Sequence, residues 1–436
     1  MKPQGIEVAI VGGGLAGLTA ACYLAKAGVD VTLFEKASHL GGRASTQYFD
    51  GYSFNRGIHA LYTGGAASQV LEDLGIPYSG HSPADVSILY QGEFHTAPYT
   101  MLTLMRSSLF GIMDKLELMR IFAKLPRVNA QELANVSTHD WLEHNVRHPQ
   151  VRQLMASLAR TFVYSSALDL VSAEVFITKM QLSLKNPVIY IDRGWQTLVQ
   201  GLRRVAEEAG TNIITGTRVE SLMVQNGHIQ GIRTNDGDDI QTQAVILAIT
   251  PKDVLKLLDT LDTKDGTAIR QIINSLIPAQ VACLDVALRS LPNSDHVIVQ
   301  DMERPRFMST QSLYSRVAPE VGALIYTFKQ LDPREKSDPR EDERDLEALL
   351  DTAQPGWRDV LVKRQYLPCI DAVGMLPTAE GGGYAGRPGT QVPGIDNLYL
   401  AGDWIGDGFL SDASFNSARL ASQQIIEHEL SAELHV

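Results

Sequence analysis

Three glycines near the start of the chain form its most specific chemical signature. The apolar run Val8 to Val11 leads into Gly12, Gly14 and Gly17, and the helix-forming run 18–27 follows. In a strand, turn and helix of this kind, the first glycine permits the tight turn, the second lets backbone approach a pyrophosphate, and the third lets helix and strand pack closely. The amide groups at the helix N-terminus then point at the anion. The pattern therefore predicts a dinucleotide site.

An acidic residue follows this unit at the separation expected for contact with a ribose. After Gly28, the apolar segment 29–34 predicts a second strand that ends at Glu35. A carboxylate in this place accepts a hydrogen bond from a ribose hydroxyl, which indicates a neutral 2′-hydroxyl and not a 2′-phosphate. The residues that we assign to nucleotide binding in this unit are Gly12, Gly14, Leu15, Ala16, Gly17, Glu35 and Lys36.

A second glycine turn follows directly and ends in an arginine. Gly41, Gly42 and Arg43 lie just after the predicted second strand. A guanidinium can neutralise phosphate and bind its oxygens through two parallel hydrogen bonds. Together with the first unit, this stretch resembles the FAD-binding signature of the flavin amine oxidase and phytoene desaturase superfamily. The resemblance implies that Gly41, Gly42 and Arg43 lie along the FAD pyrophosphate.

The C-terminal region carries the other half of the resemblance. The segment 398–401 predicts a strand that ends at Gly402 and Asp403, and a helix is expected to follow and to run through Glu427. The resemblance implies that Gly402 and Asp403 lie beside the ribityl and phosphate portion of FAD, where a carboxylate accepts hydrogen bonds from hydroxyl groups. The residues that it implies near the flavin ring are Asp412, Ala413, Ser414 and Phe415.

Two further segments are assigned by the resemblance alone. Gly57, Ile58 and His59 match a glycine and polar segment that passes beside the flavin ring in family members, and Val219 matches a residue that contacts adenine through its backbone. For His59 two interpretations stay open, because a single histidine without a visible partner is equally well explained as a loop side chain satisfied by backbone. His59 is therefore a weak catalytic candidate, and no residue is assigned as a base.

The substrate region departs from the amine oxidases of this superfamily. These enzymes commonly carry a lysine in a substrate-domain strand and an aromatic pair around the amine. The segment 281–285 contains no lysine, and no second aromatic is evident beside Phe415. Trp404, Gly408 and Phe409 are more similar to phytoene desaturase relatives, although the extended glycine and proline pattern of many of them is absent. The resemblance is therefore nearest to phytoene dehydrogenase-related proteins.

A methionine-rich region between residues 99 and 125 predicts two helices broken near Gly111. Ordinary core packing is the preferred interpretation of such an apolar stripe. The alternative is a surface or tunnel for a large apolar substrate, because methionine adapts to irregular apolar shapes. The residues that recur at helical spacing are Met101, Leu104, Met105, Leu109, Met113, Leu116, Leu118, Met119 and Phe122.

Composition restricts the cellular setting and the partners. The chain has 436 residues, a hydrophobic fraction of 44% and a net charge of −12, which make nucleic acid an unexpected partner. Its three cysteines have no metal or redox spacing, and no apolar run is long enough to span a membrane. We expect a cytoplasmic protein that binds no metal. Peripheral contact with a membrane is left open, and the sequence makes no prediction of oligomeric state.

These observations predict an α/β fold with a Rossmann-type FAD-binding domain and a discontinuous, mixed α+β substrate domain. The FAD-binding domain is expected to comprise residues 1–80, 188–276 and 366–436. The substrate domain is expected to comprise residues 81–187 and 277–365. The chain thus crosses between the two domains several times.

The expected activity is that of an FAD-dependent oxidoreductase. The resemblance implies an oxidase, dehydrogenase or desaturase that abstracts hydride from a C–H bond of a largely apolar small molecule onto flavin N5. Reduced flavin would pass its electrons to an acceptor such as oxygen or a quinone. The alternatives are a flavin amine oxidase or protoporphyrinogen-oxidase-like enzyme, and, in another class, a non-redox FAD-dependent isomerase or cyclase. A binding protein without catalysis is disfavoured, because the segment 12–35 has an intact nucleotide pattern.

Overall fold

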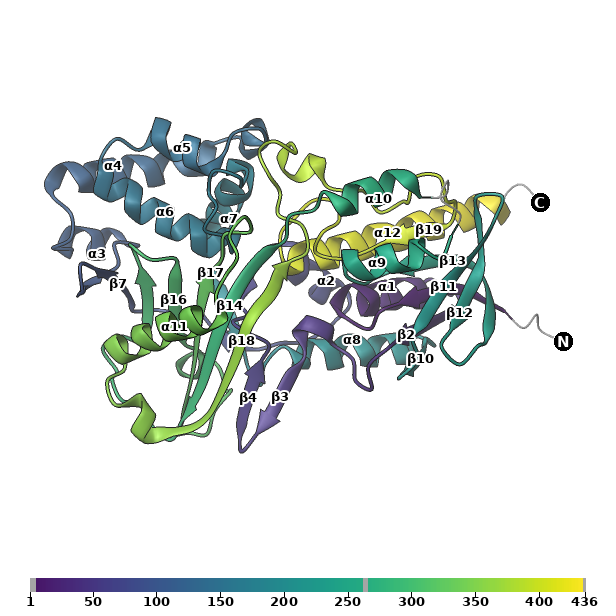
Figure 1. Ribbon diagram of the computed structural model, residues 1–436, viewed down its shortest axis with the longest axis horizontal. Helices are drawn as coiled ribbons and strands as arrows, with labels where there is room; N and C mark the ends of the chain where they lie inside the picture. Colours follow the sequence, from purple (N-terminus) through teal and green to yellow (C-terminus); the bar gives the residue numbers. More distant parts are fainter. Residues whose placement is uncertain (1–4, 262–265, 434–436) are drawn as a thin grey trace.

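The computed structural model describes residues 5–261 and 266–433, which form two sheets with helices around them (Figure 1). The first sheet lies on the right of Figure 1, near both chain ends, and the second lies at the lower left. The long strands β14 (Ala279–Leu288) and β18 (Leu361–Val373) pair with each other between these two regions. The predicted α/β fold class is confirmed.

The first sheet has the strand order β10-β2-β1-β13-β12-β11, with β19 paired to β13. Its strands β10, β2, β1, β13 and β19 are parallel, whereas β12 pairs antiparallel with both β13 and β11. The strands are β1 (Gly5–Val11), β2 (Val31–Glu35), β10 (Asn212–Thr215), β11 (Val219–Gln225), β12 (His228–Thr234), β13 (Asp239–Leu247) and β19 (Leu398–Leu400). Parallel neighbours place the carboxyl ends of β1, β2 and β19 at the same edge, where such sheets bind ligands.

Helices cover both faces of the first sheet, so its central strands are apolar on both sides. Val8 and Ile10 of β1 pack in a core with helices α1, α2, α8 and α12, and Ala9 and Val11 pack in a second core with α9 and α10. This division follows from the alternation of side chains along a strand. The helices are α1 (Leu15–Lys26), α2 (Ala66–Asp73), α8 (Gln196–Glu208), α9 (Pro251–Leu258), α10 (Thr267–Asn274) and α12 (Ser411–Glu433).

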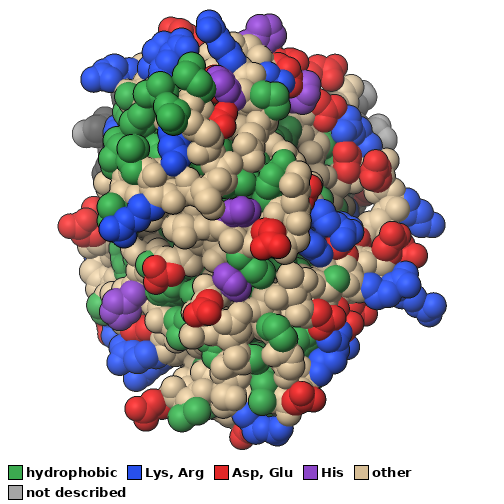
Figure 2. All heavy atoms as spheres, turned by 90° about the vertical axis from the view of Figure 1, so that its left-hand side faces the viewer, with side chains coloured by type: hydrophobic (Ala, Val, Ile, Leu, Met, Phe, Trp, Pro, Cys, Tyr) green, Lys and Arg blue, Asp and Glu red, His purple; other side chains and the backbone are tan. Residues whose placement is uncertain are grey.

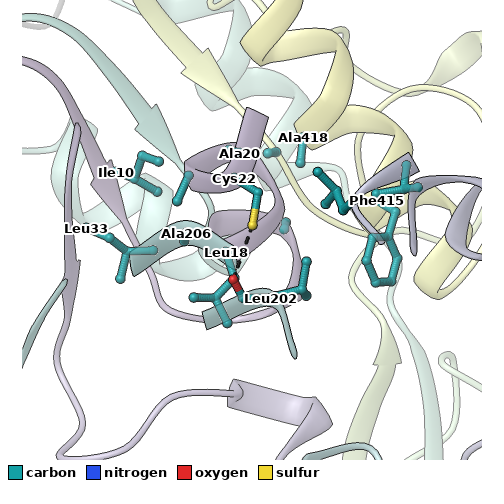
Figure 3. Packing of buried hydrophobic residues seen from close by; sticks show 14 of the residues in the cluster. Ile10, Leu18, Ala20, Cys22, Leu33, Leu202, Ala206, Phe415 and Ala418 are labelled. Carbon is teal, nitrogen blue, oxygen red and sulfur yellow. Dashed lines mark hydrogen bonds between the residues drawn. The ribbon is translucent and has the colours of Figure 1, made fainter. Parts of the chain in front are cut away.

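Small residues bring the N-terminal helix α1 against the C-terminal helix α12 (Figure 3). Ala20 and Ala418 are buried between the two helices. Ser422 Oγ donates to the Ala20 carbonyl oxygen at 3.4 Å. On the other side of α1, Cys22 Sγ lies 3.2 Å from the Leu202 carbonyl oxygen of α8. Alanine at these places allows close helix packing, which holds the two ends of the chain side by side.

The second sheet has the strand order β18-β14-β17-β16-β15-β7-β8 and is antiparallel except for the β15–β7 pair. Its strands, besides β14 and β18, are β7 (Val86–Tyr90), β8 (Glu93–Thr96), β15 (Ile298–Asp301), β16 (Arg306–Thr310) and β17 (Ala323–Gln330). The predicted domain division stays a prediction, and β18 crosses the proposed boundary between residues 365 and 366.

Helices also flank the second sheet. Helix α11 (Pro339–Ala353) buries Leu346, Leu349 and Leu350 against the sheet. The helical layer α3 to α7 lies above it at the upper left of Figure 1. These helices are α3 (Met101–Arg106), α4 (Ile112–Lys124), α5 (Thr138–Asn145), α6 (Pro149–Val163) and α7 (Ala173–Lys185). Within residues 5–261 and 266–433, no helix is long and apolar enough to cross a bilayer.

Candidate functional site

The three glycines after β1 have different surroundings, which separate their roles. A Cβ atom on Gly12, whose φ is +109°, would lie 2.5 Å from the Ala248 carbonyl oxygen, and one on Gly17 would lie 1.9 Å from the Gly12 carbonyl oxygen. A Cβ atom on Gly14 would meet nothing within 4 Å. Gly14 is the N-cap of α1, and no described side chain caps its amides. The helix therefore presents free N–H groups to an open space, as an anion requires.

The second glycine turn lies directly against the first. Gly14 and Gly41 form a parallel bridge, and the Gly41 amide donates to the Gly13 carbonyl oxygen at 2.8 Å. A Cβ atom on Gly42 would lie 3.8 Å from Gly14 Cα. Gly41 and Gly42 have φ values of +119° and +54°, which favour glycine. The two turns predicted from separate stretches thus form one backbone surface.

Glu35 ends β2 beside this surface. Its Oε2 accepts a hydrogen bond from the Gly13 amide at 2.7 Å, and its Oε1 accepts one from the Ala37 amide at 2.8 Å. Glu35, Lys36 and Val219 line a cavity of about 410 Å³ that also borders Gly12. The residues predicted to contact ribose and adenine therefore share one cavity.

Lys36 makes an ion pair at the rim of this cavity. Its Nζ lies 2.8 Å from Asp253 Oδ2, and Lys256 Nζ lies 2.8 Å from Asp253 Oδ1. Burial alone would raise the pKa of Asp253, but the two lysines hold it down to about 2. The carboxylate is therefore charged at neutral pH and fixes the Lys36 side chain.

Arg43 and Asp403, which the sequence places at opposite ends of the chain, form a bidentate ion pair. The Asp403 oxygens accept from Arg43 Nη1 at 2.8 Å and from Nη2 at 2.5 Å, and Asp403 Oδ2 also accepts from the Gly374 amide at 2.8 Å. Burial would raise the pKa of Asp403, but the Arg43 guanidinium holds it below its usual value. The Asp403 side chain is 4% exposed and that of Arg43 is 45% exposed, so the arginine still has a free face.

The start of α12 makes an ion pair that is more deeply buried than that of Arg43 and Asp403. Asp412 Oδ2 lies 3.2 Å from Lys179 Nζ of α7, and Asp412 Oδ1 accepts from the Ala67 amide at 3.0 Å. The Lys179 ammonium lies 3.9 Å from the centre of the Tyr62 ring, and its side chain is 3% exposed. Burial lowers the pKa of Lys179, and the adjacent Asp412 offsets part of that change. Asp412 thus faces α7 and α2, whereas Arg43 and Asp403 pair with each other.

The remaining residues predicted near a flavin ring lie on two elements. Ala413 and Phe415 are buried in α12 with Ser414 partly exposed beside them, and Gly402 precedes Asp403 after β19. In the 57–59 loop, His59 Nδ1 lies 3.0 Å from the Gly57 carbonyl oxygen, and the ring packs on Trp195 at 5.1 Å between centroids. Burial lowers the pKa of His59, so the imidazole is neutral at pH 7. His59 thus has a backbone partner, as expected if it is an ordinary loop side chain and not a catalytic residue.

Comparison with known proteins decides the class of this site. Residues 15–289, more than half of the chain, match the family model described as flavin containing amine oxidoreductase. The chain belongs to this family. It is therefore an FAD-dependent oxidoreductase, and the cofactor and enzyme class expected from the sequence are confirmed.

Relatives of this flavoenzyme differ in what they act on. A 4,4′-diaponeurosporene oxygenase from Staphylococcus aureus is 22% identical over 353 residues, which cover 72% of this chain and 69% of that protein. A crystal structure of an oxidoreductase from Methanosarcina mazei aligns with a TM-score of 0.76 and 17% identity over 96% of this chain and 100% of that one. Cyclohexylamine oxidase from Brevibacterium oxydans aligns with a TM-score of 0.71 and 16% identity over 97% and 99%. These two structural matches establish the fold only.

The described residues of the flavoenzyme fit FAD. The open space over Gly14, the uncapped amides of α1 and the cavity beside Glu35 lie along the carboxyl edge of the first sheet. The exposed face of Arg43 adds a positive charge at this edge. Together they offer backbone donors, a guanidinium and a carboxylate, which are the groups that a pyrophosphate and a ribose require.

Sequence reasoning missed two buried polar residues in the flavoenzyme. Lys179 interrupts the apolar run of α7, and a lysine within such a run is a sequence signal that could have identified this residue. Asp285 of β14 is fully buried, and its Oδ2 accepts from Gln365 Nε2 at 3.1 Å, whereas Oδ1 makes no hydrogen bond of normal geometry to a described residue. Burial raises the pKa of Asp285 well above its usual value, and Gln365 and the Gly57 backbone offset only part of the rise. Burial therefore favours the protonated form of Asp285, which lies next to the 57–59 loop.

Proposed function

We propose that this flavoenzyme oxidises a C–H bond of a largely apolar small molecule. When bound, FAD supplies the hydride acceptor at N5 and passes electrons on to oxygen, a quinone or another acceptor. The residues to which we assign the nucleotide and diphosphate are Gly12, Gly14, Leu15, Ala16, Gly17, Glu35, Lys36, Gly41, Gly42, Arg43 and Val219. The residues to which we assign the ribityl chain and ring are Gly57, Ile58, His59, Gly402, Asp403, Asp412, Ala413, Ser414 and Phe415.

The observation that carries the proposal is an apolar cluster on the second sheet beside the 57–59 loop. Ile58 packs against a cluster whose buried members include Phe328 and Cys283. Tyr164 stacks on Phe328 with 5.4 Å between ring centres, and Phe307 lies 5.5 Å from Phe328. Aromatic and aliphatic side chains of this kind bind apolar molecules and exclude water.

Burial disfavours the charged forms of the polar groups near this cluster. Burial lowers the pKa of His59 and raises the pKa of Asp285 well above its usual value. Burial also raises the pKa of Tyr164. Surroundings that disfavour charge favour an apolar substrate over a charged amine. The chain's contribution is to position the substrate and keep water out.

Anaerobic reduction of the bound flavin tests this proposal. The holoenzyme is mixed with carotenoids, porphyrinogens or amines in detergent, and its visible flavin absorbance is followed. We expect bleaching by an apolar polyene or porphyrinogen and none by amines. Bleaching by amines alone would replace the proposal with amine oxidation, and turnover that needs prior reduction but no acceptor would replace it with isomerisation. A colourless protein that cannot be reconstituted with FAD would contradict both.

A further inference from the structure

We propose that the hairpin of α3 and α4 docks this enzyme on an anionic membrane surface. The side chains that define this docking surface are Tyr99, Met101, Leu102, Met105, Ile112, Met113 and Leu116. They are seven of the thirteen exposed large hydrophobic side chains among the described residues. Ile112 is 80% exposed, and Met101 and Met113 are each 62% exposed. Figure 2 shows hydrophobic side chains gathered at the upper left of the face that carries these helices, next to Lys and Arg.

The inner faces of α3 and α4 pack in the core, so the exposed apolar side chains project from ordered helices. Leu104 of α3 and Leu118 and Ile121 of α4 are buried in the core below. Lys115 Nζ donates to the Met105 carbonyl oxygen at 3.0 Å, which fastens the end of α3 to α4. The α3 N-terminus has a reciprocal Thr100 and Thr103 cap. The exposed residues are therefore the outer face of packed helices, and the preferred expectation of core packing is wrong for Met101, Met105, Met113 and Leu116.

The charges around the docking surface favour an anionic partner. Arg106, Arg120, Lys124 and Arg127 are all exposed on or beside the two helices, in a chain whose net charge is −12. Residues 120 and 124 continue the row of Leu116 along α4 at intervals of four, so they lie on the same helix face. The row therefore changes from apolar to basic along one helix.

The two acidic residues of α4 point inward and do not oppose this charge. The Glu117 carboxylate accepts from the Arg147 amide at 2.7 Å and from the His148 amide at 2.9 Å. Asp114 accepts from the Gly111 amide at 3.0 Å and pairs with His148 Nδ1 at 2.8 Å. The charged residues that are fully exposed on the two helices are therefore all basic.

Exposed apolar side chains next to basic residues are the combination that binds a lipid bilayer. Leucine, isoleucine and methionine side chains enter the boundary between headgroups and acyl chains, while neighbouring cations reach anionic headgroups. A protein partner of matching shape would instead be expected to use aromatic and arginine anchors in a packed pocket. On the docking surface Tyr99 is the sole aromatic side chain among the exposed large hydrophobics.

The inference deepens the proposed function and rests on it for the source of substrate. Tyr164 packs both against the apolar core beneath the hairpin and against the cluster beside Ile58. Docking through α3 and α4 would therefore bring the apolar interior of the substrate region next to the bilayer. An apolar molecule dissolved in lipid would reach the enzyme without crossing water.

Flotation with lipid vesicles tests the docking surface. Holoenzyme is mixed with vesicles of phosphatidylcholine, with or without phosphatidylglycerol, and the protein that floats is measured by flavin absorbance. We expect binding to the anionic vesicles, with a bound-to-free ratio that falls about tenfold in the I112S/M113S/L116S variant. The R120E/K124E variant should lose the preference for phosphatidylglycerol and the dependence on salt. A variant with Leu313→Ser and Val321→Ser, which are exposed outside the docking surface, is the matched control and should bind like the natural protein.

Three outcomes would overturn the docking proposal. The natural protein fails to float, the I112S/M113S/L116S variant floats as well as the control, or the natural protein is a dimer that this variant converts to a monomer without vesicle binding. Thermal melting and flavin absorbance verify that each variant is folded and loaded. Flavin reduction in detergent, measured on the same samples, reports the proposed function separately.

Discussion

The two glycine turns of the first sheet and the proposed substrate region differ in how far apart their interacting residues lie in the sequence. Gly14 bridges to Gly41, and the Gly13 amide donates to Glu35, all within the β1-α1-β2 unit and the turn that follows it. By contrast, Asp412 in α12 meets Lys179 in α7, and Asp285 meets Gln365 on a neighbouring strand. A βαβ unit fixes its own geometry, because its parallel strands and connecting helix are obligatory neighbours. The proposed substrate region depends on packing between distant segments, as does the pairing of Arg43 with Asp403, so neither can be predicted from one stretch of the sequence.

The largest expected effect concerns Gly17, compared with Gly14. A Cβ atom on Gly17 would strike the Gly12 carbonyl oxygen, whereas one on Gly14 enters open space. We expect Gly17→Ala to lose more than about 3 kcal/mol of unfolding free energy and to yield little folded protein. Gly14→Ala should change the stability of the apoprotein by less than about 1 kcal/mol, yet weaken FAD binding about tenfold. Urea unfolding and FAD titration separate the two effects, and equal behaviour of both variants would contradict the assigned roles.

A smaller effect is expected at Lys179, in the substrate region. Lys179→Met leaves the buried Asp412 carboxylate without its cation, which should cost about 3 kcal/mol of unfolding free energy. Adding Asp412→Asn removes the orphaned charge, so the double variant should recover more than half of the loss. Urea unfolding of the single and double variants measures the coupling. Additive losses would show that the two side chains do not act as a pair.

The Arg43 and Asp403 pair should contribute less, because half of the arginine is in water. We expect Arg43→Met to cost about 1–2 kcal/mol at pH 7. The pKa of Asp403 is lowered in the folded protein, so its stabilisation is present above its unfolded pKa of about 3.9 and is lost as pH falls below that value. The difference between Arg43→Met and the natural protein should therefore shrink below about pH 4. Urea unfolding at several pH values tests this, and a difference independent of pH would contradict the pairing.

The methionine-rich helices show where sequence periodicity stops being informative. The spacing correctly predicts helices and a break at Gly111, which is the N-cap of α4. It does not distinguish Leu118, which is buried, from Leu116, which is exposed on the same helix. Periodicity reports that one face is apolar, but only the arrangement of other segments decides whether protein or solvent covers it. The sequence alone therefore could not predict the docking surface.

The fold class and cofactor were predictable because their signals depend on neighbouring residues and not on distant segments. Glycine conformations and a strand-end acid are local requirements, and Gly12, Gly41 and Glu35 satisfy them within a short stretch. The pairing of Arg43 with Asp403 was not predicted, because both were assigned to a ligand and not to each other. Asp285 was not predicted either, because an isolated acid in an apolar strand carries no pattern that indicates a functional site. Burial, which raises the pKa of that acid, is a property of the packed sheets and has no signature in the residue itself.

The smallest expected effect concerns Glu35, which lies beside the two glycine turns. Glu35→Gln keeps the side-chain shape, but the amide has one acceptor oxygen where the carboxylate has two, so either the Gly13 or the Ala37 amide loses its partner. FAD binding should weaken by about threefold to tenfold, at most about 1.4 kcal/mol. Glu35→Ala should weaken it further, because both backbone amides lose their acceptor. FAD titration of the apoprotein measures the series, and unchanged affinity in both variants would remove Glu35 from the ribose site. Because Glu35 binds the Gly13 and Ala37 amides and is not part of the apolar cluster beside Ile58, neither variant should alter which substrate bleaches the flavin.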